Sequence, residues 1–113
     1  MYIALEGIDT AGKSTQIERL KHVFPDAIIT KEPGGTATGI EIRSMVLHGD
    51  LKSKMAEMFL FLADRAEHMQ QIILPNKDKL IISDRSVVSG MAYASVHHLC
   101  PQSTLVQLNE LAT

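Results

Sequence analysis

The segment 7–14 constrains the fold of this chain more than any other stretch. It reads Gly7-Ile8-Asp9-Thr10-Ala11-Gly12-Lys13-Ser14 and matches the phosphate-binding loop pattern G-x-x-x-x-G-K-[ST]. Apolar residues at 2–5 precede it and predict a buried strand, and the segment 15–20 that follows predicts a helix. The alternative is a glycine-rich turn with a chance lysine, which the agreement of strand, glycines, Lys-Ser pair and helix disfavours. The sequence therefore predicts a site for a nucleoside triphosphate.

The chemistry of this loop assigns a role to most of its residues. We expect its backbone N–H groups to surround a β-phosphate, assisted by the positive end of the helix dipole. Lys13 is expected to reach the β- and γ-phosphates, and the hydroxyl of Ser14 to ligate Mg²⁺. The predicted ATP-binding set consists of Gly7, Ile8, Asp9, Thr10, Ala11, Gly12, Lys13, Ser14 and Thr15.

Strand and helix patterns alternate along the rest of the chain. We expect strands at 2–6, 27–30 and 80–83. Helices are expected from the loop to about residue 24 and over 38–48, 53–74, 86–98 and 103–112. This alternation predicts an α/β fold with a parallel sheet, in a single domain spanning residues 1–113. The longest helix carries an apolar stripe that we assign to the core: Met55, Met58, Phe59, Leu62, Ala66 and Met69.

The irregular segments after the three strands carry most of the polar chemistry. Because ligands of parallel α/β sheets bind at the carboxyl ends of the strands, we expect the loop, the segment 32–35 and Asp84-Arg85 to meet there. Asp84 is predicted to hold Mg²⁺, directly or through water, and Arg85 to clamp a phosphate. A surface ion pair is the alternative for these two residues. Arg43 and Arg65 flank the same edge and predict a second anionic group.

Composition narrows the class of protein. The 113 residues are 45% apolar and 21% charged, with a formal net charge of −2, which argues against a nucleic-acid partner. No apolar run approaches the ~20 residues of a membrane span, and because Met1 leads directly into the first predicted strand we expect no signal peptide. The single Cys100 suits a reducing cytoplasm, and His97-His98 are expected to be solvated residues at a helix end. No guanine-reading N-K-x-D motif occurs.

Four motifs, taken in order, resemble those of the thymidylate kinase family. They are Glu6–Gln16, Glu32-Pro33-Gly34-Gly35-Thr36, Phe61-Leu62-Ala63-Asp64-Arg65-Ala66 and Asp84-Arg85. The resemblance covers the whole chain. It implies a P-loop NTPase of the nucleoside monophosphate kinase type, with three layers, that transfers the γ-phosphoryl group of ATP to dTMP for dTTP biosynthesis. It also implies Mg²⁺ as cofactor, ATP as co-substrate and a homodimer packed through helices.

The resemblance also implies roles for individual residues. Phe61 would stack on thymine, Arg65 would hydrogen-bond a thymine carbonyl, and Tyr93 would pack near the deoxyribose. Arg43 and Arg85 would hold the acceptor side, with Arg85 toward the dTMP phosphate. The implied substrate-binding set is Asp9, Glu32, Pro33, Arg43, Phe61, Arg65, Arg85, Gly90 and Tyr93, with Glu6 at the same pocket. The implied catalytic residues are Lys13, Arg85 and Asp9, and Ser14 and Asp84 would hold the metal.

Several features depart from the family pattern. Thr10 replaces a usual glycine, Ser86 follows Asp84-Arg85 where an aromatic residue is usual, and Gly90 stands where Asn or Ser is common. The family also continues beyond Thr113 with a lid and further strands, so we expect the chain to be a fragment. In the implied strand order, 2-3-1, the first strand would lie at an edge. A kinase for another nucleoside monophosphate and a non-catalytic nucleotide-binding fragment remain the alternatives.

Overall fold

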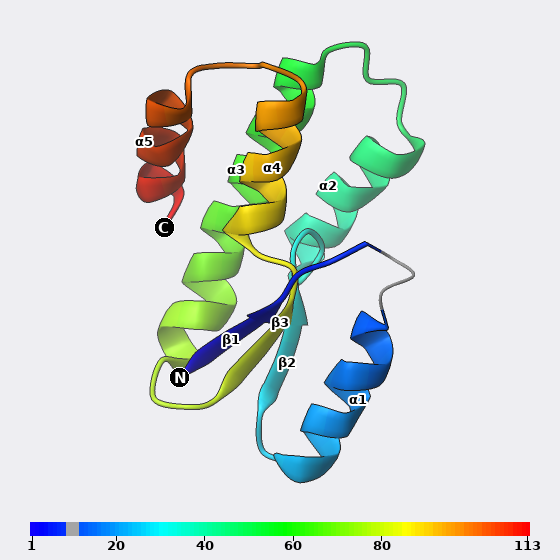
Figure 1. Cartoon of the computed structure of the whole chain (residues 1–113), viewed down its shortest axis with the longest axis vertical. Helices are drawn as coiled ribbons and strands as arrows, with labels where there is room; N and C mark the ends of the chain where they lie inside the picture. The colour runs from blue at the N-terminus through cyan, green and yellow to red at the C-terminus, as the bar shows by residue number, and fades with distance from the viewer. Residues whose placement is uncertain (9–11) are drawn as a thin grey trace.

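A computed structural model describes residues 1–8 and 12–113 of the chain. Three parallel strands form one sheet, in which β3 (Ile81–Asp84) lies between β1 (Tyr2–Leu5) and β2 (Ile28–Lys31) (Figure 1). This order and the parallel pairing confirm the predicted α/β sheet. In each pair the strands run in register, so that Leu5, Asp84 and Lys31 are neighbours at their carboxyl ends. The three following segments therefore leave the sheet at one edge, as the sequence predicted.

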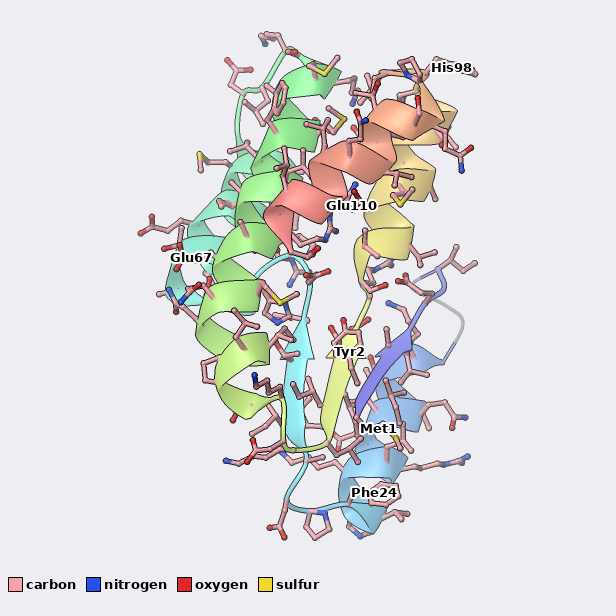
Figure 2. The ribbon with its side chains drawn as sticks, turned by 90° about the vertical axis from the view of Figure 1, so that its left-hand side faces the viewer. Met1, Tyr2, Phe24, Glu67, His98 and Glu110 are labelled. Atoms are coloured by element: carbon pink, nitrogen blue, oxygen red, sulfur yellow. The ribbon has the colours of Figure 1, made fainter. Side chains whose placement is uncertain are left out.

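The predicted helices all occur, with bounds that shift by a few residues. Their bounds are Lys13–Val23 for α1, Ala37–His48 for α2, Lys54–His68 for α3, Val87–Val96 for α4 and Gln102–Ala112 for α5. The sheet lies between α1 on one side and α3 on the other, which gives the three predicted layers (Figure 2). Helices α2, α4 and α5 gather beyond the carboxyl ends of the strands (Figure 1).

Side-chain caps define three of the helix starts. Thr36 caps α2 by accepting from the N–H of Gly39 at 2.9 Å, and Ser53 caps α3 by accepting from Ala56 at 3.1 Å. Ser86 caps α4 by accepting from the N–H of Val88 at 3.3 Å. Each hydroxyl satisfies a backbone donor that has no partner inside the helix.

The predicted single helix over 53–74 is wrong in its second half. The α-helix ends at His68, and a π-helical segment over Met69–Ile73 and a 3₁₀ turn over Leu74–Asn76 follow. Pro75 gives the physical reason, because it lacks an N–H and its ring clashes with the carbonyl four residues earlier in a regular helix. Asn76 donates its side-chain amide to the carbonyl of Ile72 at 2.8 Å and so satisfies an acceptor near this helix end.

The assignment of the whole α3 stripe to the core is also wrong. Met58 is buried, whereas Phe59 is 53% exposed and Met55 is exposed. The core on this side consists of Met58, Ala94 and Leu105, which join α3, α4 and α5. Cys100 is half buried against the same cluster, and His97 and His98 are exposed after the end of α4, as predicted.

The strands differ in burial according to their place in the sheet. Ile81, Ile82 and Ser83 of the central β3 are almost fully buried. Within the described part of the chain β1 pairs only with β3, and Tyr2 is exposed, so the prediction of a fully buried first strand is wrong. In residues 1–8 and 12–113, no helix combines the length and apolarity that a membrane crossing requires.

Candidate active site

The phosphate-binding motif leads from β1 into α1. Helix α1 begins at Lys13, and Gly12 before it has φ 84° and ψ 18°, in the left-handed region. Gly7 also has a positive φ, of 148°, so both motif glycines adopt conformations that other residues rarely take. Among the described residues no side chain caps α1, and its first N–H groups are therefore available to an anion. Asp9, Thr10 and Ala11, which the sequence placed in the site, lie outside the described residues.

Lys13 and Asp84 form an ion pair at the centre of this edge. The Nζ of Lys13 lies 2.7 Å from Oδ1 of Asp84, and the Lys13 side chain is only 9% exposed. The pair connects the start of α1 to the end of β3. Because an ammonium group has three donors, Lys13 can keep this contact and still donate to a phosphate oxygen.

The predicted metal ligands, Ser14 and Asp84, line the same cavity of about 370 Å³ beside the loop. A hydroxyl and one carboxylate suit Mg²⁺, which retains several waters and is bound by few protein oxygens together with substrate phosphates. Among residues 1–8 and 12–113, no group of three or more His, Cys, Asp or Glu side chains is arranged as a metal site. The donor set therefore fits a Mg²⁺ ion that arrives with the nucleotide.

A second cavity, of about 290 Å³, opens between α2, α3 and α4, and the segments that follow β2 and β3 also line it. It brings together eight residues of the predicted acceptor site: Glu32, Pro33, Arg43, Phe61, Arg65, Arg85, Gly90 and Tyr93. Glu6, which was expected at the same pocket, does not line the cavity. Val46, Leu47, Asp64, Ser86 and Ser89 complete the lining. We call this space the acceptor cavity.

Two aromatic rings form one wall of the acceptor cavity. Phe61 of α3 and Tyr93 of α4 make an edge-to-face contact with ring centroids 5.7 Å apart and an interplanar angle of 76°. The hydroxyl of Tyr93 donates to the carboxylate of Glu57. Burial, followed by this hydrogen bond, raises the pKa of Tyr93 to about 12, so the phenol is a neutral donor at physiological pH.

A buried guanidinium group forms the inner wall. Arg65 is 5% exposed, and its Nε lies 3.5 Å from Oε2 of Glu32. Its Nη1 donates to the side-chain oxygen of Asn109 at 2.6 Å. A planar cation thus borders the cavity with its orientation determined by protein groups on two elements.

Comparison with known proteins agrees with this geometry. The family model described as thymidylate kinase matches residues 5–112. The chain belongs to the thymidylate kinase family.

Related thymidylate kinases match over the whole chain. The chain is 61% identical to the thymidylate kinase of Aliarcobacter butzleri and 64% identical to that of Sulfurimonas denitrificans. Each alignment covers 100% of this chain, which spans about 58% and 59% of those two proteins. The crystal structure of thymidylate kinase from Ehrlichia chaffeensis superimposes with a TM-score of 0.87 at 33% identity, covering 100% of this chain and 68% of that one.

Behind the acceptor cavity lies a buried polar network that sequence reasoning missed. His68 contacts Thr30 Oγ1 through Nε2 at 2.5 Å and Glu32 Oε1 through Nδ1 at 3.1 Å. Asp64 accepts from the N–H of Gly34 at 3.0 Å. Burial raises the pKa of Asp64, and this hydrogen bond opposes the increase. Helical spacing offered a signal, because positions 61, 64, 65 and 68 share one face of α3.

The junction of β3 and α4 shapes the remaining side of the cavity. Arg85 adopts a left-handed backbone conformation with φ 70°, and its carbonyl accepts from the hydroxyl of Ser83 at 2.8 Å. Glu6, after β1, accepts hydrogen bonds from the hydroxyls of Ser86 and Ser89. Ser86, which departs from the family's aromatic residue, thus serves both as helix cap and as partner of Glu6.

Proposed function

We propose that the protein phosphorylates dTMP with ATP to give dTDP, the step that leads to dTTP. One observation carries this proposal: a single cavity, lined in part by the segments that follow β2 and β3, contains eight residues that the resemblance to thymidylate kinases assigns to the acceptor. Family membership supports the same reaction. The two related proteins described above are both named thymidylate kinase, and each aligns with the whole of this chain.

On the donor side, the loop and the start of α1 would hold the phosphates of ATP. The ammonium group of Lys13 would donate to the β- and γ-phosphates and neutralise charge that develops as the phosphoryl group moves. Ser14 and Asp84 would hold Mg²⁺, which supplies further neutralisation of phosphate charge when bound. Asp9 stays a predicted catalytic and acceptor-binding residue from the motif.

On the acceptor side, the cavity offers groups suited to each part of dTMP. Phe61 presents an aromatic ring for stacking on thymine, and Arg65 a donor fork for a base carbonyl. Arg43 and Arg85 would bind the dTMP phosphate, whose oxygen attacks the γ-phosphorus in line with the leaving ADP. Tyr93 would crowd the position of a ribose 2′-hydroxyl. Catalysis then rests on positioning and charge neutralisation rather than on covalent chemistry by the protein.

A panel of acceptors tests this proposal. The full-length protein is assayed for ADP release from ATP and Mg²⁺ with dTMP, dUMP, CMP, AMP and GMP. We expect dTMP to have the highest kcat/KM. A higher kcat/KM for another nucleotide would instead assign a different acceptor, and the absence of ADP release with all five would indicate a non-catalytic nucleotide-binding protein.

The proposal extends to assembly and location. We infer a cytoplasmic homodimer from the family resemblance, and the exposed apolar side chains of Met55 and Phe59 on α3 support a helix-packed interface. Sedimentation of the full-length protein tests the dimer, and a monomer at micromolar concentration would contradict it.

A further inference from the structure

We propose that Asn109 of α5 is a positioning residue that orients the guanidinium group of Arg65 for the acceptor base. This inference rests on the proposed function, because it assigns Arg65 to dTMP binding. Asn109 does not line the acceptor cavity, so it would act through Arg65 and not by touching the nucleotide.

The geometry of the amide supports a dedicated contact. Asn109 is 8% exposed, and its Nδ2 donates to the carbonyl of Leu105, one turn earlier in α5, at 2.8 Å. This bond fixes the amide so that Oδ1 points at Arg65 Nη1, 2.6 Å away. Both polar atoms of the amide are therefore used, one inside its own helix and one across to α3.

The other contacts of Arg65 are longer. Oε2 of Glu32 lies 3.5 Å from Nε, and Nε has no hydrogen-bond partner among the described residues. The carbonyl of Ser86 lies 3.5 Å from Nη2. The bond to Asn109 is thus the shortest of these contacts, and hydrogen bonds to a charged group are stronger than those between neutral groups.

Gly90 of α4 leaves room for the guanidinium group of Arg65 because it has no side chain. A Cβ atom at position 90 would lie 3.0 Å from Nη2 and 3.5 Å from Nη1 of Arg65. The absence of a side chain therefore leaves the space that the guanidinium group occupies next to Asn109.

Steady-state kinetics of Asn109→Ala in the full-length protein test the proposal. We expect the KM for dTMP to rise about tenfold to a hundredfold, from loss of a charge-assisted hydrogen bond, while the KM for ATP changes less than about twofold. Asn109→Asp keeps an oxygen acceptor for Arg65 but loses the donor to the Leu105 carbonyl, so its dTMP KM should lie between those of wild type and Asn109→Ala. Gln107→Ala, an exposed change in the same helix, is the matched control.

A second variant keeps the proposal testable if Asn109→Ala does not fold. Gly90→Ala should also raise the dTMP KM, because its methyl group would displace the guanidinium group while leaving Asn109 in place. Calorimetric titration with dTMP should show the same loss of affinity in both variants. An unchanged dTMP KM in Asn109→Ala or in Gly90→Ala would overturn the positioning role. A wild-type protein inactive on dTMP would instead refute the proposed function itself.

Discussion

The phosphate-binding loop together with the Lys13–Asp84 pair, which we call the loop edge, is built differently from the acceptor cavity. At the loop edge, contiguous residues and one ion pair, Lys13–Asp84, provide the groups that would meet ATP. The acceptor cavity takes its lining from α2, α3, α4 and the segment after β2, and buried side chains support it from behind. The first region uses backbone geometry, which a short motif specifies. The second uses side chains whose positions depend on the packing of several helices.

This difference predicts different responses to mutation. A change at the loop edge should lower the rate of phosphoryl transfer and leave the stability of the fold nearly unchanged, because few other side chains contact these groups. A change in the network behind the acceptor cavity should reduce stability and acceptor binding together, because buried polar groups there would lose their partners.

Lys13→Ala should have the largest effect. We expect turnover to fall about 10²–10⁴-fold, or about 3–5 kcal/mol of barrier, because the charge that stabilises the transition state is lost. Single-turnover ADP release on the full-length protein measures this, and Lys21→Ala on an exposed position of α1 is the control. Activity within a few-fold of wild type would mean that Lys13 does not have the assigned role.

His68→Leu should destabilise the fold by disrupting the buried polar network behind the acceptor cavity. The change leaves the carboxylate of Glu32 and the hydroxyl of Thr30 buried without this partner, at a cost of about 2–4 kcal/mol in the free energy of unfolding. Urea unfolding measures the cost. His22→Leu, at an exposed position of α1, is the matched control, and equal stabilities of the two variants would show that the network contributes little.

Phe61→Ala should affect acceptor binding more than ATP binding. Loss of a stacking surface costs about 1–3 kcal/mol, so the KM for dTMP should rise by roughly ten- to a hundredfold while the KM for ATP changes little. Phe24→Ala removes an exposed ring away from the acceptor cavity and is the control. If both variants raise the two KM values equally, Phe61 serves only in packing.

Asp64→Asn should have the smallest effect, visible in the pH dependence of stability. Because burial raises the pKa of Asp64 above its ordinary value of 3.8, the folded protein holds this proton more tightly than the unfolded chain. Ionisation of Asp64 therefore lowers stability as the pH rises from below 3.8 through the folded pKa.

The variant lacks this loss, so its free energy of unfolding relative to wild type should increase as the pH rises across that window. Urea unfolding at several pH values measures the difference, with the exposed Asp78→Asn as control. A pH-independent difference would mean that the Asp64 carboxylate is fully compensated in the folded state.

The sequence predicted most of the fold because the signals are local. A strand, a glycine-rich turn and a helix follow one another in the phosphate motif. Strand and helix patterns also alternate along the chain, and this alternation indicated a parallel sheet. The errors arose where neighbours decide the outcome. A regular helix was expected over 53–74, but the α-helix ends at His68 and a π-helical segment follows it. Phe59 matched the apolar period of α3 and yet lies exposed, because periodicity does not reveal which helices cover that face.

The candidate site divides in the same way. The sequence by itself determined the phosphate-binding loop and the family, and it predicted the acceptor residues, since each depends on short motifs whose chemistry follows from residue type and spacing. Only the tertiary structure decided that Arg65 meets Asn109, which is 44 positions away, and that His68 joins Thr30 to Glu32. These contacts exist because α5 packs on α3 and α3 covers the sheet, and no local pattern encodes the distance between two packed elements.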